Sequence, residues 1–188
     1  MSSIRTVPTD RVVAPAKLAH VVLRTAHHDE AIAWYQEVLG ARCVFRNPVL
    51  AFLTYDEEHH RLALVNVGAE APQAPPGAPG LEHVAFTYAS LGDLLATYRR
   101  LATRGQIPAW SVNHGPTTSM YYVDPDGNQV ELQVDNFECA EDLLAWFRTD
   151  AFAENPIGVP FDPERLVAAY EAGTPDADLL APPGVGGS

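Results

Sequence analysis

The stretch Leu18-Ala19-His20-Val21-Val22-Leu23 recurs 63 residues later in the chain as Leu81-Glu82-His83-Val84-Ala85-Phe86. In both copies a histidine stands third, before β-branched and apolar residues that are typical of a strand. The correspondence continues to Tyr35 and Tyr98, each inside a stretch whose apolar residues have helical spacing. An isolated polar ring at the start of a strand contributes little to a core. A duplicated one would bring two imidazoles together across a pseudo-twofold axis, where they could bind a metal ion.

The repeat extends to the order of the predicted elements. Residues 16–67 form the first module, with a strand over 17–25, a helix over 29–39 and strands over 41–46, 49–55 and 61–67. A linker rich in proline and glycine covers residues 68–80. Residues 81–134 form the second module, which repeats the order with a helix over 91–104 and a turn at Asp124-Pro125-Asp126-Gly127-Asn128. The sequence therefore predicts an α+β domain over 16–134 made of two βαβββ modules.

Segments of different character flank this domain. Residues 1–15 read as an N-terminal arm, and residues 135–188 as a helical extension with a flexible tail. Helices are expected over 138–147 and 163–172, where they could either cover a cavity as a lid or bury a subunit interface. We favour the interface and expect a homo-oligomer. His27 and His28 open the first helix, and both are expected to be exposed to solvent.

The composition excludes several classes of function. The chain has 188 residues, of which 47% are apolar and 19% charged, so one domain with a packed core is expected. The formal net charge is −12 and no basic stripe is visible, which argues against nucleic acid or an anionic membrane as partner. The N-terminal region has no apolar segment typical of a signal peptide, and the chain's two cysteines, Cys43 and Cys139, form no CxxC pattern. A cytoplasmic location is expected.

Three residues are the candidate metal ligands. His20 and His83 occupy equivalent places in the two repeats, and Glu131 lies in an alternating terminal strand over residues 128–134. If that strand pairs beside the second module's first strand, Glu131 faces the same cavity as His83. Two imidazoles and one carboxylate suit a first-row divalent ion, and with open positions they match the ligand set of non-haem Fe(II) oxygenases. A single histidine on a strand is more often a hydrogen-bonded core residue, but two at equivalent positions are harder to explain by chance.

The first module offers no fourth ligand. Glu131 is the seventh residue after Asp124, and the same count from Asp56 reaches Ala63, with no carboxylate in residues 61–67. The protein is therefore expected to supply three ligands and to leave one face of the ion free.

The modules and the His20, His83 and Glu131 set resemble the vicinal oxygen chelate superfamily. Within it, further stretches are similar to the one-domain type I extradiol dioxygenases, which cleave catechol rings. These stretches are His59-His60-Arg61-Leu62-Ala63-Leu64, His114-Gly115-Pro116-Thr117-Thr118-Ser119-Met120-Tyr121 and Tyr121-Tyr122-Val123-Asp124-Pro125-Asp126-Gly127-Asn128-Gln129-Val130-Glu131. The resemblance covers about residues 16–134. Many members have two such domains, so this chain resembles the small branch, whose pattern does not explain the C-terminal helices.

The resemblance implies a reaction and a role for each residue. An Fe(II)-dependent enzyme, with Mn(II) as the alternative ion, would insert O2 into a catechol-type aromatic diol to give a muconic semialdehyde. His60 would be the acid–base histidine, whose pKa range suits proton transfer near neutral pH. His114 would hydrogen-bond the substrate hydroxyl or stabilise charge on the ring, and Tyr121 would orient a substrate oxygen. His59 is expected at the surface and Tyr122 in packing. Four further side chains could line an apolar wall or belong to the core: Leu50, Phe52, Trp110 and Met120.

Two other classes stay open at this point. The first is a different metal enzyme of the same superfamily, such as a glyoxalase, an epimerase or a thiol transferase acting on fosfomycin. Glyoxalase-like sites use a fourth protein ligand, which Ala63 does not provide, and a transferase does not account for His60 and Tyr121 together. The second is a non-catalytic module that sequesters a small molecule such as bleomycin, for which the three metal ligands would be superfluous.

Overall fold

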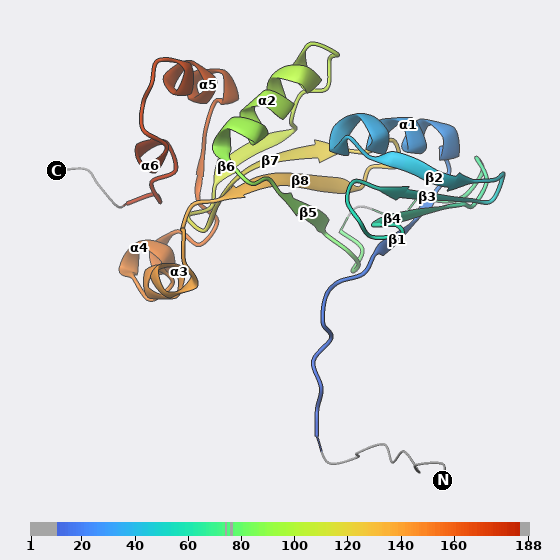
Figure 1. Cartoon of the computed structure of the whole chain (residues 1–188), viewed down its shortest axis with the longest axis horizontal. Helices are drawn as coiled ribbons and strands as arrows, with labels where there is room; N and C mark the ends of the chain where they lie inside the picture. Colours follow the sequence, from blue (N-terminus) through green and yellow to red (C-terminus); the bar gives the residue numbers. More distant parts are fainter. Residues whose placement is uncertain (1–10, 74, 76, 185–188) are drawn as a thin grey trace, which may run out of the picture.

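Two mixed β-sheets, one from each half of the chain, form the body of the molecule in the computed structural model (Figure 1). The structure describes residues 11–73, 75 and 77–184. The strand order is β1-β4-β3-β2 in the first sheet and β5-β8-β7-β6-β9 in the second. The elements of the two modules are β1 (Val21–Thr25), α1 (His28–Leu39), β2 (Arg42–Arg46), β3 (Leu50–Thr54), β4 (Leu62–Asn66), β5 (His83–Thr87), α2 (Leu91–Ala102), β6 (Trp110–Asn113), β7 (Thr117–Val123) and β8 (Gln129–Asp135). The predicted βαβββ order is therefore confirmed in both halves.

The first strand of each module lies beside the last strand of the same module. β1 pairs in parallel with β4, and β5 pairs in parallel with β8. In these registers Val22 lies opposite Ala63, while Ala85, the repeat equivalent of Val22, lies opposite Glu131. Ala63 thus holds in the first module the place that Glu131 holds in the second, which agrees with the equal counts from the two turns.

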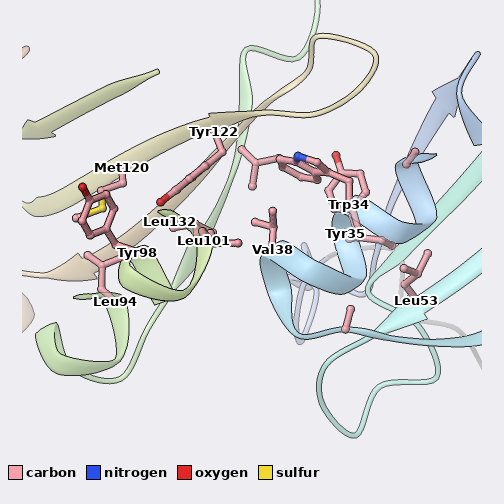
Figure 2. Close-up of a cluster of buried hydrophobic side chains, with 14 of the residues drawn as sticks. Trp34, Tyr35, Val38, Leu53, Leu94, Tyr98, Leu101, Met120, Tyr122 and Leu132 are labelled. Carbon is pink, nitrogen blue, oxygen red and sulfur yellow. The ribbon is translucent and has the colours of Figure 1, made fainter. Parts of the chain in front are cut away.

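The helices α1 and α2 cover one face of the sheets and, among the described residues, leave the other face uncovered. α1 contacts β3 and β4, and α2 contacts β8 (Figure 1). Because side chains alternate along a strand, Val130 and Leu132 on β8 join the core, and Glu131 between them points to the opposite face. The buried apolar side chains of both modules form one continuous cluster, and Figure 2 shows part of it, from Trp34 and Val38 on α1 to residues of the second module.

Two hydrogen bonds, one buried and one partly buried, tie the modules together. The Tyr35 hydroxyl on α1 donates to the Asp124 carboxylate in the turn between β7 and β8, at 2.9 Å. The Arg100 guanidinium on α2 donates to the backbone carbonyl of Glu37 on α1, at 2.6 Å. Burial, followed by the Asp124 carboxylate, raises the pKa of Tyr35, so this phenol stays protonated as a donor. Tyr35 therefore contributes to the contact between the modules.

Tyr35→Phe is expected to lower the free energy of unfolding by about 1.5–3 kcal/mol, because it removes a buried hydrogen bond to a charged acceptor. Tyr122→Phe is a matched control, because Tyr122 is 2% exposed and its hydroxyl has no hydrogen-bond partner among the described residues. Removing that hydroxyl is expected to leave stability unchanged or to raise it slightly. Urea unfolding of the two variants measures the difference, and equal losses would show that the Tyr35 contact does not stabilise the fold.

The C-terminal extension attaches to the second module. Its elements are α3 (Ala140–Trp146), α4 (Asp150–Glu154), β9 (Val159–Pro160), α5 (Pro163–Glu171) and α6 (Asp176–Leu179). The two predicted helices are confirmed as α3 and α5, whereas the edge strand β9 beside β6 was not predicted. α5 packs on α2, where the Tyr98 hydroxyl donates to Glu164 at 2.7 Å. The homo-oligomer and the domain boundaries stay predictions.

The structure covers only part of the two segments predicted at the ends of the chain. Residues 1–10 of the predicted arm and residues 185–188 of the predicted tail lie outside the described residues. Among the residues that are described, no helix combines the length and apolar character needed to cross a lipid bilayer.

The expectation that both histidines at the start of α1 are solvated is wrong for His28. Its side chain is 7% exposed, whereas that of His27 is 41% exposed. His28 lies on the helix face that also carries Ala31, Ile32 and Tyr35, which are three, four and seven residues further on. This face packs against the first sheet and therefore buries His28 with it.

Candidate active site

His83 and Glu131 meet on the open face of the second sheet. His83 begins β5, and Glu131 lies on the adjacent strand β8, opposite Ala85. Glu131 is 4% exposed, and its Oε2 lies 2.9 Å from Nε2 of His83. A carboxylate in such a buried place requires a partner of opposite charge or a metal ion. A separation of about 3 Å also fits two adjacent ligands of an octahedral ion with bonds of about 2.1 Å, so this pair suits a divalent metal.

Aromatic side chains surround this pair on the same face. The Tyr121 ring lies edge-on to His83, with ring centroids 5.4 Å apart, and Tyr121 is opposite Glu131 in the ladder of β7 and β8. Trp110 on β6 stacks on Tyr121 at 5.1 Å. Burial and the Glu131 carboxylate raise the pKa of Tyr121, which keeps its phenol protonated. Tyr122 points to the core, as predicted, so the register selects Tyr121 as the residue that faces the site.

His114 extends this cluster from the loop that follows β6. Its Nε2 lies 2.9 Å from the Tyr121 hydroxyl, and its Nδ1 lies 2.5 Å from the backbone carbonyl oxygen of Ile157. Four predicted site residues are thereby brought together: His83, His114, Tyr121 and Glu131.

His20 and His60 lie in a second group, on the first module. Their ring centroids are 4.3 Å apart, and the His60 ring stacks on Phe52 of β3 at 4.3 Å with an interplanar angle of 12°. Within the described part of the chain, no three histidine, cysteine or acidic side chains lie close enough to hold one metal ion. The structure therefore joins His83 to Glu131 and does not join His20 to them.

The His20 group nevertheless borders the second module. A cavity of about 150 Å³ is lined by His20 and Val21 on one side and by Val84, Ala85 and Phe86 of β5 on the other. Tyr55, at the end of β3, contacts Phe86 edge-on with ring centroids 5.8 Å apart. His20 thus faces the strand whose Ala85 is paired with Glu131. Binding of one ion by all three predicted ligands requires His20 to move from the His60 ring toward β5.

The surroundings of His60 favour a neutral ring. Burial, followed by the neighbouring His20 and His59, lowers the pKa of His60 below its usual value. His59 is exposed, as predicted, but its Nδ1 lies 2.6 Å from Nδ1 of His60. This contact was not predicted, because two adjacent histidines in a charged turn have no sequence signature of a shared hydrogen bond.

The four candidates for an apolar wall divide between the open face and the core. Trp110, 39% exposed, and Phe52 lie against the tyrosine and histidine of the site. Met120 is fully buried in the core cluster, whereas Leu50 is half-buried and belongs to neither group. The wall interpretation therefore applies to the two aromatic residues, and the core interpretation to Met120.

The sequence and fold are similar to those of several known proteins. Residues 17–132 match the model of the family described as the Glyoxalase/Bleomycin resistance protein/Dioxygenase superfamily. Biphenyl-2,3-diol 1,2-dioxygenase 3 of Rhodococcus globerulus is 46% identical over 164 residues, which are 87% of this chain and 86% of that protein. Biphenyl-2,3-diol 1,2-dioxygenase 2 of the same organism is 44% identical with the same coverage. The solved glyoxylase/bleomycin resistance protein/dioxygenase domain from Frankia sp. EAN1pec has a TM-score of 0.54 at 21% identity, covering 65% of this chain and 99% of that one. The family match spans both modules and ends before the C-terminal extension.

Proposed function

Because this chain belongs to the glyoxalase/bleomycin resistance protein/dioxygenase superfamily and is an extradiol ring-cleaving dioxygenase, we propose that it uses Fe(II) to cleave an aryl-substituted catechol. The observation that carries the proposal is the His83 and Glu131 pair, whose donor atoms lie 2.9 Å apart beside the Tyr121 ring. The proposed ligands are His20, His83 and Glu131, and the proposed catalytic residues are His60, His114 and Tyr121. When bound, Fe(II) would supply the redox centre at which O2 and the two vicinal oxygens of the diol meet.

Three donors leave room for substrate at the ion. Ala63 stands where a fourth carboxylate would lie if the first module matched the second. Its methyl group has no lone pair to offer. The chain would therefore hold the ion with three side chains and leave the remaining coordination to substrate and O2, whereas a four-ligand lyase site would use one more protein ligand.

The side chains around the pair have distinct proposed tasks. The Tyr121 hydroxyl donates to His114, so its oxygen is free to accept a hydrogen bond from a substrate hydroxyl and orient the ring. Trp110, stacked on Tyr121, offers an aromatic surface beside that ring. His60, neutral at the far side of the site, would take a substrate proton and return it as the ring opens. Glu131 is 4% exposed, so its carboxylate is shielded from bulk water.

The size of the open face supports a substrate larger than catechol. Phe45, 45% exposed, lies 5.5 Å from Phe52 on the first sheet, and Val22 on β1 is 53% exposed. These side chains continue the apolar surface beyond the rings that face the metal ligands. An aryl substituent on the diol would cover them, so biphenyl-2,3-diol, on which the two named relatives act, is the proposed substrate class.

Ring cleavage can be tested directly. The protein is loaded with Fe(II) without oxygen, mixed with catechol or biphenyl-2,3-diol, and then exposed to air. A yellow ring-fission product with one O2 consumed per diol is expected, and faster turnover with biphenyl-2,3-diol would support the aryl pocket. Resorcinol is the control, because its hydroxyls are not vicinal. Protein that binds one Fe(II) per chain and colours neither diol would contradict the proposed function, and activity restored by Mn(II) but not by Fe(II) would contradict the proposed metal.

A further inference from the structure

The two hydrogen bonds of His114 define which of its nitrogens carries the proton. The carbonyl oxygen of Ile157, 2.5 Å from Nδ1, has no proton to give, so Nδ1 must be the donor. In the neutral ring Nε2 then holds a lone pair, and it accepts from the Tyr121 hydroxyl at 2.9 Å. The Ile157 carbonyl therefore determines the direction of the hydrogen bond between His114 and Tyr121. Ile157 belongs to the C-terminal extension, 43 residues further along the chain.

The segment that carries Ile157 is held firmly against the His114 loop. β9 pairs with β6, with Val159 opposite Asn113. Gly158 has φ +103° and approaches the loop so closely that an added Cβ would lie 2.1 Å from the Asn113 carbonyl oxygen and 2.6 Å from Cα of His114. Asn155 closes the turn before β9, since its side chain donates to the Gly158 carbonyl at 2.8 Å and accepts from the Gly158 N–H at 3.0 Å. Only glycine fits this contact.

A second contact from the extension reaches the residue after His114. Trp146 at the end of α3 is 6% exposed and lies over Gly115. A Cβ on Gly115, whose φ is +96°, would lie 1.9 Å from the Trp146 ring. Phe152 of α4 packs on Trp146, with ring centroids 5.0 Å apart. Two separate parts of the extension thus lie against His114 and Gly115, and both contacts depend on a glycine.

We propose that the segment Asn155–Pro160 is a positioning element of the active site, in which the Ile157 carbonyl fixes the tautomer and orientation of His114. Through His114 it directs the Tyr121 hydroxyl, so that the Tyr121 oxygen presents its lone pairs to the substrate. The inference rests on the proposed function for its catalytic consequence, but the tautomer is a property of the protein alone. This positioning role gives the C-terminal extension a part in the reaction. Such a part is different from the roles of a lid or a subunit interface.

Gly158→Ala tests the positioning role, because the added methyl group pushes the segment away from the His114 loop. We expect kcat to fall by about 10–100-fold with unchanged iron content, as for a misplaced active-site group. Gly173→Ala is the matched control: Gly173 also lies in the extension with φ +85°, but a Cβ there would meet no atom within 4 Å. Both variants place alanine at a positive φ, so only the steric contact with the His114 loop distinguishes them. The kcat of Gly173→Ala is therefore expected to stay within about twofold of the wild type.

A spectroscopic readout separates the inference from the proposed function. In metal-free protein labelled with 15N-histidine, long-range 1H–15N spectra are expected to show His114 protonated at Nδ1, and this signature should be lost in Gly158→Ala and kept in Gly173→Ala. If Gly158→Ala does not fold, Asn155→Ala, at an exposed position, weakens the same turn and should shift the spectrum in the same direction. Wild-type His114 protonated at Nε2, or a Gly158→Ala variant with wild-type kcat, would overturn the inference. Wild-type protein that cleaves no diol but shows the Nδ1 tautomer would contradict the proposed function alone.

Discussion

Glu131→Ala is expected to give a folded protein that retains no Fe(II) and cleaves no catechol. The carboxylate is one of three proposed ligands, so metal affinity should fall by more than the roughly 10–100-fold that follows loss of an outer partner. The fold should persist, because Glu131 faces the open side of β8 and its neighbours Val130 and Leu132 supply the core contacts. Iron content after gel filtration and oxygen uptake with biphenyl-2,3-diol measure the effect.

Gln133→Ala is the control for this experiment. Gln133 lies two residues further along β8 on the same face, where its amide donates to the Thr87 hydroxyl at 3.1 Å. This variant is expected to bind iron and turn over normally. A Glu131→Ala protein with one iron per chain would refute the ligand assignment. His20→Ala is the more discriminating companion, because the structure keeps His20 apart from the other two ligands. Full iron retention in His20→Ala would remove His20 from the ligand set and leave His83 and Glu131 in it.

His60→Phe is expected to slow turnover by roughly 10²–10⁴-fold, the usual contribution of a general acid–base residue. Iron content and KM should stay near the wild-type values. Phenylalanine preserves the aromatic stacking on Phe52, where the His60 ring lies at 4.3 Å with an interplanar angle of 12°. The variant therefore removes the proton-transfer group and keeps the shape of this part of the site. Steady-state oxygen uptake at several diol concentrations separates kcat from KM.

The control for His60→Phe is His27→Phe, at the partly exposed start of α1, which should behave as the wild type. An unchanged kcat in His60→Phe would reduce His60 to a turn residue. Loss of iron in that variant would instead assign His60 a part in holding His20, whose ring centroid lies 4.3 Å away. Measurement of iron and kcat on the same preparation distinguishes these results.

The repeat was sufficient to predict the fold and the part of the site in which His83 meets Glu131. Strand and helix periodicity is a local property, so the two βαβββ modules could be read from the recurrence of the His20 and His83 phrases. The sequence also predicted that the first module lacks a fourth ligand. Ala63 and Glu131 lie at the same distance along the chain from the preceding turns, and they hold equivalent positions in the β1–β4 and β5–β8 ladders. The pairing of His83 with Glu131 followed from the expectation that β8 lies beside β5. Burial of His28 was readable in principle from its spacing to Ala31 and Tyr35.

Spacing along one chain is enough to show which residues share a strand, a helix face or a ladder position. Which side chains of the two modules meet depends instead on how the two sheets pack in three dimensions. This packing grouped His20 with His60 on one sheet and His83 with Glu131, Tyr121 and His114 on the other. It also brought the Ile157 carbonyl to His114, and no pattern of side chains could have predicted this, since every residue carries a carbonyl group. Contacts across sheets and through the backbone depend on how elements distant in sequence pack, and local periodicity contains no record of that packing.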